Sequence, residues 1–409
     1  EERTIHNVVA RIAAAPTATG VEDRPILLGN HRDAWVYGAA DPNSGTATMM
    51  EVAASLGKLV KAGWRPKRSI YFLSWSGEEY NLIGSTAWAE HNSKTLLEKT
   101  VVYINCDTAV SGRTLSVSST LSLVPVIEGV MGDVPDPASN PDTPTTLLDS
   151  FKASGGEVGI LGSGSDYASF LHHVGIAAVN FEFEISSKHS RVTTYGTYHS
   201  VYDSFDWMEQ FGDPGFLYTT VAAQFWGLLA LRMSEPDILP FDLAVQAKLL
   251  SDQVSDFEAL VPDSEKVGLG DLLDALKGFK SAAEELNRDV AAADLAKIST
   301  EDVEQLNDKL SLCERQFLRP EGEGGLPSRP WFKHVLQAPG LYLGYGAVAF
   351  PGIAQGIDEN DWDMVQREVS ASRKCIRLAT SFISSTAQKL KEIEKKLVLR
   401  RRQRGSERP

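Results

Sequence analysis

Five side chains of types that bind zinc are spread along this 409-residue chain, with a sixth acidic residue beside one of them. The five are His31, Asp41, Glu79, Asp107 and His199, and the sixth is Glu78. Zinc in proteins takes nitrogen and carboxylate ligands, and a catalytic zinc leaves one position open for water. Two zinc ions about 3.5–4 Å apart can share a bridging carboxylate and a bridging water, and can clamp the oxygens of a reacting carbonyl. Two histidines, three acidic ligands and one spare base are the set that such a centre needs.

Three of these ligands follow predicted strands. Short apolar runs that indicate buried strands occupy residues 25–29, 69–75 and 101–106. The ligands that come just after them are His31, Glu79 and Asp107. Because open α/β sheets place their sites at the carboxyl ends of the strands, we expect these side chains to meet. The alternation of strands and helices over residues 1–235 predicts an α/β fold, with a mixed sheet between two helical layers.

The other two ligands lie in polar turns. Asp41 begins the turn Asp41-Pro42-Asn43-Ser44-Gly45, which opens a helix predicted over residues 46–62. A carboxylate there meets the positive end of the helix, and the Asp-Pro bond permits a cis geometry that would aim Asp41 at both metals. His199 lies in a polar loop before another helix. Asp33 is expected to hold the second ring nitrogen of His31 through its carboxylate.

Each of these residues has an ordinary structural explanation when it is taken alone. A strand-end Asp often caps a helix, paired Glu residues at a helix start complement its dipole, and a lone His is usually a hydrogen-bonding core residue. These explanations fail jointly, because six such residues fall at the same end of one sheet. The structural explanation is kept for the histidines outside the set, His6, His91, His172, His173 and His189, and the role of His334 is left open.

These motifs closely resemble the M28 zinc peptidases, and within them the branch of glutamate carboxypeptidase II and the transferrin receptor. The resemblance covers residues 3–400. It rests on His31-Arg32-Asp33 with Asp41 ten residues later, on Glu78-Glu79, on Asp107, and on Tyr198-His199-Ser200-Val201-Tyr202. Further similar stretches are residues 61–66, 83–90, 161–166, 332–335, 338–339 and 350–353.

The resemblance implies a dizinc exopeptidase of carboxypeptidase or dipeptidase type, which hydrolyses small peptides through a metal-bridging hydroxide. The implied ligands are His31 and Asp107 on one zinc, Glu79 and His199 on the other, and Asp41 bridging them. Glu78 would act as the general base, and Tyr198 would donate to the oxyanion. The implied substrate-binding residues are Gly164, Ser165, Asn180, Glu182 and Tyr345.

Departures from the family pattern concern the substrate. The acidic-dipeptide enzymes of the family hold a terminal glutamate with a Lys-Tyr pair, which here reads Gly344-Tyr345. Two closely spaced Arg positions of those enzymes align with Asn180 and Glu182. Since carboxylates are recognised by Arg or Lys, an acidic dipeptide specificity is not expected.

The family's structural calcium site also departs from the pattern. One of its Glu positions reads Ala87 here, although Glu90 matches the other, which puts that site in doubt.

Two other functions compete with this one. An aminopeptidase of the same fold would need an acidic partner for the substrate's α-amine, and Glu182 could supply one. A non-catalytic binding or sorting protein of the transferrin-receptor type has this fold but has lost metal ligands. Because all five ligand positions and the base are present here, the sequence favours an enzyme.

Residues 236–400 turn helical after the boundary at Glu235-Pro236. One apolar stripe runs through Val365, Val369, Ile376, Ala379, Ile383, Leu390, Ile393 and Leu397, and another through Val303, Leu306, Leu310, Cys313 and Phe317. The stripes fit an intramolecular bundle, and the resemblance adds a helical domain that forms a homodimer. The basic residues 401–409 are expected to be a disordered tail.

Composition sets further bounds. The net charge of −14 argues against a nucleic-acid partner, because proteins that bind nucleic acids carry a basic surface stripe. Three distant cysteines, Cys106, Cys313 and Cys375, indicate core residues and no disulfide framework. No run of about 20 apolar residues occurs. The resemblance implies that a missing upstream part holds a membrane span and an apical domain, and places the chain on the extracellular or vacuolar lumenal side of a membrane.

Overall fold

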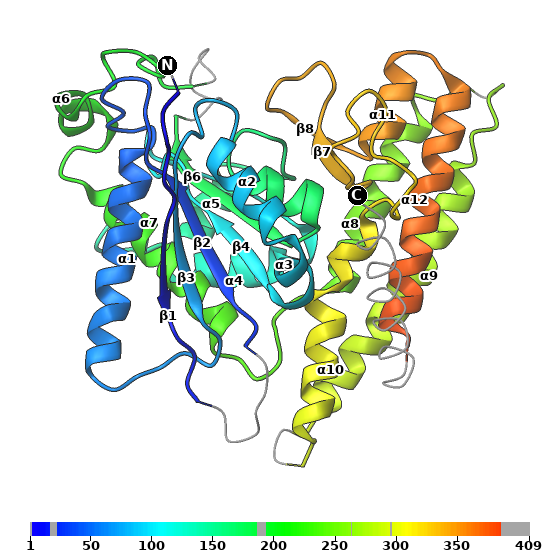
Figure 1. The fold of residues 1–409 in the computed structure, drawn as a ribbon, viewed down its shortest axis with the longest axis horizontal. Helices are drawn as coiled ribbons and strands as arrows, with labels where there is room; N and C mark the ends of the chain where they lie inside the picture. The colour runs from blue at the N-terminus through cyan, green and yellow to red at the C-terminus, as the bar shows by residue number, and fades with distance from the viewer. Residues whose placement is uncertain (1, 17–22, 186–193, 263, 295–296, 386–409) are drawn as a thin grey trace.

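The computed structural model describes the chain except for residues 1, 17–22, 186–193, 263, 295–296 and 386–409 (Figure 1). The strands are β1 (Val8–Ile12), β2 (Ile26–His31), β3 (Ile70–Trp75), β4 (Val102–Asn105), β5 (Thr114–Ser119), β6 (Ala178–Glu184), β7 (Gln337–Pro339) and β8 (Ala347–Ala349). The α-helices are α1 (Asn43–Lys61), α2 (Ile83–His91), α3 (Ser93–Lys99), α4 (Val124–Asp133), α5 (Leu147–Ala153), α6 (Phe205–Trp207), α7 (Leu217–Ser234), α8 (Leu243–Glu258), α9 (Leu269–Ala292), α10 (Thr300–Ser311), α11 (Pro351–Asp358) and α12 (Trp362–Ile383). Short 3₁₀ or π segments are η1 (Leu121–Leu123), η2 (Ser169–Val174), η3 (Met208–Gly212) and η4 (Cys313–Phe317).

The first six strands form one mixed sheet in the order β1-β3-β2-β4-β6-β5. The four central strands are parallel, and the edge strands β1 and β5 pair antiparallel with their neighbours. The predicted mixed α/β sheet is therefore confirmed. Parallel strands bring their carboxyl ends to one edge, so the ends of β2, β3 and β4 lie side by side there.

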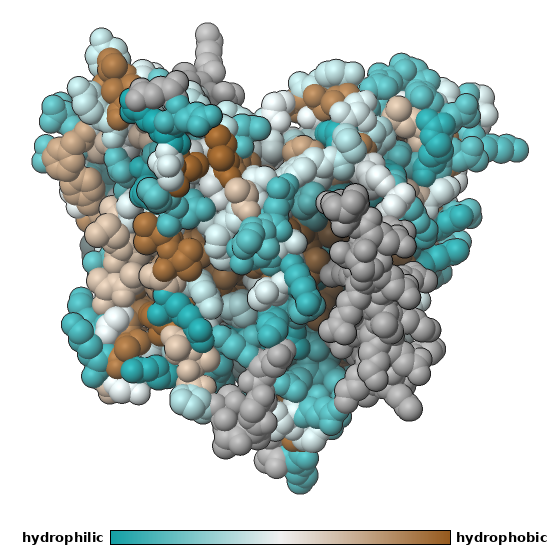
Figure 2. Space-filling model, viewed as in Figure 1, coloured by the Kyte–Doolittle hydropathy of each residue, from teal (hydrophilic) through white to brown (hydrophobic). Residues whose placement is uncertain are grey.

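Two helical layers cover the sheet (Figure 1). Successive residues of a strand point to opposite faces. Ile26 and Leu28 of β2 therefore join the core cluster that includes residues of α1, α4 and α7, while Leu27 joins a second cluster with residues of α2, α3 and η2. Both faces are apolar because both are buried. The edge strand β1 exposes Val8 and Val9, and apolar surface gathers over it in Figure 2.

The C-terminal region is helical, as predicted, with one addition: the two-stranded antiparallel sheet of β7 and β8. The stripe from Val365 to Ile383 lies on α12, whereas its last three members, Leu390, Ile393 and Leu397, and the basic tail lie outside the described residues. The stripe that begins at Val303 spans two elements, because α10 ends at Ser311 and the chain continues as η4. Ser299 caps α10, as its position predicts. In the described part of the chain, no helix combines the length and apolarity needed to cross a membrane.

Polar contacts join the C-terminal region to the sheet region. The guanidinium of Arg315 in η4 donates to the carbonyl oxygens of Leu96, Leu97 and Thr100 at the end of α3. Carbonyls in the last turn of a helix lack some or all of their intrahelical partners, so a buried arginine can satisfy several of them, although that of Leu96 also accepts from the N–H of Thr100. One buried apolar cluster also includes residues from both regions.

Candidate metal centre

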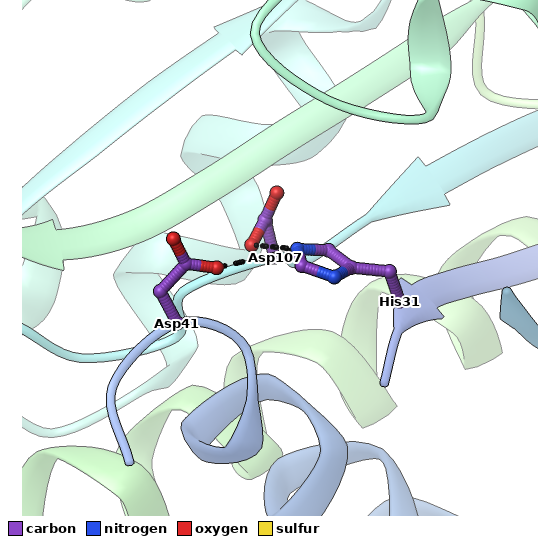
Figure 3. Close-up of side chains that lie close together, drawn as sticks. All are labelled: His31, Asp41 and Asp107. Atoms are coloured by element: carbon purple, nitrogen blue, oxygen red, sulfur yellow. Dashed lines mark hydrogen bonds and ion pairs between the residues drawn. The ribbon is translucent and has the colours of Figure 1, made fainter. Parts of the chain in front are cut away.

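The end of β2, the turn before α1 and the segment after β4 bring three of the predicted ligands together (Figure 3). His31 is 1% exposed, and its Nε2 lies 2.9 Å from Oδ1 of Asp107 and 3.3 Å from Oδ1 of Asp41. One ligand atom from each of the three residues lies within 4.8 Å of the others. This spacing suits a single metal ion, which would sit among the three atoms.

A second set of three shares Asp41. Nε2 of His199 lies 3.1 Å from Oδ2 of Asp41 and 3.1 Å from Oε2 of Glu79, and the three ligand atoms again lie within 4.8 Å of one another. Asp41 therefore turns one carboxylate oxygen toward each histidine. All five predicted ligands are brought together in the pattern of a bridged pair of sites.

The carboxylates at this site are suited to binding cations. Burial and the charge of Asp107 raise the pKa of Glu78 to about 10, and burial and the charge of Asp41 raise the pKa of Glu79 to about 8. Oε1 of Glu79 is buried and has no hydrogen-bond partner in the described part of the chain. A divalent cation favours the ionised form of each carboxylate. It would therefore stabilise this crowded group and bind the carboxylate oxygen that lacks a hydrogen bond.

Asp33 differs from its prediction. The Nδ1 atom of His31 lies 3.0 Å from the backbone carbonyl oxygen of Asp33, while the nearest carboxylate oxygen lies 3.7 Å away. A carbonyl only accepts, so Nδ1 carries a proton, and in the neutral ring Nε2 keeps its lone pair toward the metal position. The Asp33 carboxylate instead accepts from the N–H groups of Glu78 and Glu79, at 3.2 and 3.3 Å. Its contribution is to fix the segment that carries the base and a ligand.

Two side chains without a predicted role hold the ligand backbones in place. Asn30 donates to the carbonyl oxygens of Cys106 and Asp107, which ties the end of β2 to the segment after β4. Asp203 is 2% exposed and accepts from the N–H groups of Ala40 at 2.8 Å and of Asp41 at 3.1 Å. It lies four residues after His199, so it links the Asp41 turn to the loop that carries the other histidine. Its sign in the sequence is its position directly after the Tyr198–Tyr202 motif.

Tyr198 and Tyr345 meet above the His199 side of the centre. The Tyr198 ring stacks on His199 with a centroid distance of 3.6 Å. Burial, the charge of Asp41 and a side-chain hydrogen bond with Tyr345 raise the pKa of Tyr198, so the phenol keeps the proton that an oxyanion donor needs. The carbonyl oxygen of Tyr345 accepts from the N–H of Ser163 at 3.1 Å. The C-terminal region therefore contributes to the rim of the site.

The predicted substrate residues of the sheet region form a chain leading away from Asp107. Ser165 donates to Oδ2 of Asp107 at 2.6 Å, Asn105 donates to Ser165 at 3.0 Å, and the same Asn105 amide donates to Asn180 at 2.9 Å. Asn105 was not predicted, and its signal was only that it ends a strand. Ser165 and Asn180 are thus engaged in positioning Asp107.

Gly164 and Glu182 also border the site. A Cβ added at Gly164 would come 3.3 Å from Cβ of Tyr345, so the glycine permits this close approach. Glu182 is half-buried on the face of β6 that Asn180 occupies. Burial, with the charges of Glu184, Asp107 and Asp41, raises its pKa to about 8. No hydrogen bond or ion pair is formed by its carboxylate within the described residues, so it remains available to a cationic group.

The remaining histidines and the cysteines agree with structural roles where the structure describes them. His172 and His334 are fully buried, and His334 contacts Glu314 at 2.9 Å. His189 lies outside the described residues. Cys106, Cys313 and Cys375 are buried and free, as predicted. Glu90, at the doubtful calcium position, accepts from the indole N–H of Trp331 at 2.9 Å.

Comparison with known proteins places this arrangement in a family. The sequence profile of Peptidase family M28 matches residues 7–211, and that of the transferrin receptor-like dimerisation domain matches residues 267–384. The probable glutamate carboxypeptidase LAMP1 of Arabidopsis thaliana is 39% identical over 373 residues, covering 88% of this chain and 51% of that protein.

Two other relatives give a similar coverage. A probable glutamate carboxypeptidase of Arthroderma benhamiae is 37% identical over 89% of this chain and 50% of its own length. The aminopeptidase NAALADL1 of Rattus norvegicus is 36% identical over 85% of this chain and 49% of its own. The chain thus spans about half the length of the curated relatives it matches. It belongs to peptidase family M28 and carries a transferrin receptor-like dimerisation domain after the peptidase region.

Proposed function

We propose that this chain forms the metal-binding part of a zinc peptidase that uses two zinc ions. The observation that carries the proposal is the Asp41 carboxylate, whose two oxygens face two separate sets of ligands. His31 and Asp107 would hold one ion, Glu79 and His199 the other, and Asp41 would bridge them. When bound, such ions lower the pKa of a water molecule and polarise the carbonyl of a peptide bond.

The protein's own groups supply the remaining chemistry. Oε2 of Glu78 lies 3.7 Å from Nε2 of His31, beside the metal positions but outside both ligand sets. Glu78 takes a proton from the attacking water and passes it to the leaving amine. Tyr198 donates a hydrogen bond to the oxygen that becomes negative as the carbonyl is attacked.

The proposed substrates are small peptides that are cleaved at one end. Carboxypeptidase or dipeptidase activity is the first candidate, because two of the relatives named above are probable glutamate carboxypeptidases. Aminopeptidase activity is the second candidate, since Glu182, which has no partner among the described residues, suits an α-amine and another relative is named an aminopeptidase. Hydrolysis of Ala-Gln with a free and with an acetylated N-terminus separates them. Preference for the acetylated peptide would reject the aminopeptidase.

The transferrin receptor-like domain supports a homodimer as the assembly. Equilibrium sedimentation at micromolar concentration is expected to show twice the chain mass, and a monomer alone would count against this part of the proposal.

The mechanism is tested by changing Glu78→Gln. We expect zinc content to be retained and hydrolysis to fall by about 10²–10⁴-fold, which is the usual contribution of a general acid–base group. Glu51→Gln, an exposed change on α1, is the matched control. Zinc would be measured by plasma emission spectroscopy on both variants. Full turnover by the Glu78→Gln variant would remove Glu78 from its assigned role.

A further inference from the structure

Two exposed aromatic rings lie together beside the His199 half of the metal centre. The centroid of Trp35 is 5.0 Å from that of Tyr80 and 6.0 Å from that of His199, and Trp35 is edge-on to the imidazole. Trp35 is 45% exposed and Tyr80 is 65% exposed. Aromatic side chains gain more than most from burial, so a pair that meets in solvent next to a polar centre is a surface suited to a ligand.

The chain fixes this pair relative to the metal ligands. Trp35 lies on the segment between His31 and Asp41, and Tyr80 directly follows Glu79. The backbone at Glu79 is in turn held by the Asp33 carboxylate. The backbone segments that carry the two rings therefore also carry or adjoin predicted ligands.

We infer that Trp35 and Tyr80, here called the aromatic shelf, bind an apolar side chain, above all an aromatic one, of the residue next to the peptide bond that is cleaved. The inference rests on the proposed peptidase function and names the substrate class that this function would favour. A residue's Cα lies about 1.5 Å from its own carbonyl carbon. A peptide carbonyl bound beside His199 thus brings the adjoining side chains within reach of the Trp35 ring.

The charges around the shelf favour an apolar occupant over an acidic one. Ring faces carry partial negative charge and repel carboxylates. The half-buried Glu182 and the ligand carboxylates lie on the same side of the sheet edge, and no Arg or Lys forms an ion pair with them within the described residues. A basic side chain could instead stack on Trp35 through a cation–π contact, and the test below separates that outcome from the apolar one.

The test compares hydrolysis of X-Ala and Ala-X dipeptides by the zinc-loaded protein, with X as Phe, Leu, Gly, Lys or Glu. We expect kcat/KM for Phe to exceed that for Gly by at least about tenfold in one of the two positions, which is the usual effect of a filled apolar pocket. The Phe-to-Gly ratio should collapse toward one in Trp35→Ala and Tyr80→Ala. Trp35→Phe should restore most of it, because it keeps a ring. Met50→Ala, which removes another exposed apolar side chain from α1, should leave the ratio as it is.

A binding measurement makes the test independent of turnover. Saturation-transfer NMR with N-acetyl-phenylalaninamide and N-acetyl-glycinamide as probes should show binding of the first to the wild type, and loss of that binding in Trp35→Ala. If no peptide is hydrolysed but this difference holds, the proposed function fails while the shelf stands. A Phe-to-Gly ratio unchanged in both Ala variants, or a preference for Lys or Glu that these variants abolish, would overturn the inference.

Discussion

The two halves of the candidate metal centre are built on different supports. His31 ends a strand, is almost fully buried and is fixed through Nδ1 by a backbone carbonyl. His199 lies in a loop with φ of 56°, is 30% exposed, and is supported by a stacked tyrosine. Positive φ is uncommon for residues other than glycine. The His31 half is therefore set by the sheet, whereas the His199 half depends on local loop contacts.

The largest expected difference between the halves concerns stability. In metal-free protein, His31→Ala leaves buried carboxylates without their partner and should lower the free energy of unfolding by about 3 kcal/mol. His199→Ala removes a partly exposed partner and should lower it by less than about 1 kcal/mol. Both variants should lose hydrolysis. Urea unfolding with chelator present measures the difference, and equal losses would mean that both halves are supported alike.

The next prediction concerns pH. In chelated protein the pKa values of Glu78 and Glu79, about 10 and 8, lie above the ordinary value of 4.5, and that of His31 is raised as well. Between about pH 5 and 8 the folded chain then binds more protons than the unfolded chain. The free energy of unfolding therefore falls as pH rises, by roughly 1.4 kcal/mol per pH unit for each extra proton that the folded chain holds.

Zinc should reverse that trend. Its ligands bind when deprotonated, so zinc binding strengthens with pH and adds stability to the folded chain. Urea midpoints at pH 5, 6, 7 and 8, with zinc and with chelator, check both signs. A chelated protein that gains stability up to pH 8 would show that the carboxylates are not crowded.

The smallest expected effect tests what joins the halves. Asp203→Ala removes the acceptor for the Ala40 and Asp41 N–H groups. We expect zinc affinity to fall by about 10–100-fold, as for other residues that orient ligands. The exposed Asp206→Ala is the matched control. Zinc titration against a competing chelator measures the change; an unchanged affinity would show that the bridge positions itself without Asp203.

The same contrast explains what the sequence could predict. Strand-end ligands such as His31 and Asp107 can be predicted from apolar runs that stop at a polar residue. They are expected to meet because parallel strands end at the same edge of the sheet. The sequence predicts that the Asp33 carboxylate meets His31, but the backbone carbonyl of Asp33 lies nearer to the ring, because the turn after β2 decides which oxygen faces it. Asn105 and Asp203 carry no motif of their own. The contact of Tyr345 with Ser163 joins distant segments, and only packing decides it.

The contribution of Tyr345 to the rim has a consequence for biosynthesis. Chains emerge from the ribosome N-terminus first, and their parts fold in that order. All five candidate ligands and Glu78 leave the ribosome before Tyr345, whose side chain forms a hydrogen bond with Tyr198 and whose carbonyl accepts from the N–H of Ser163. The candidate ligands can therefore come together before Tyr345 is available, and the finished rim marks a chain whose synthesis has passed β7.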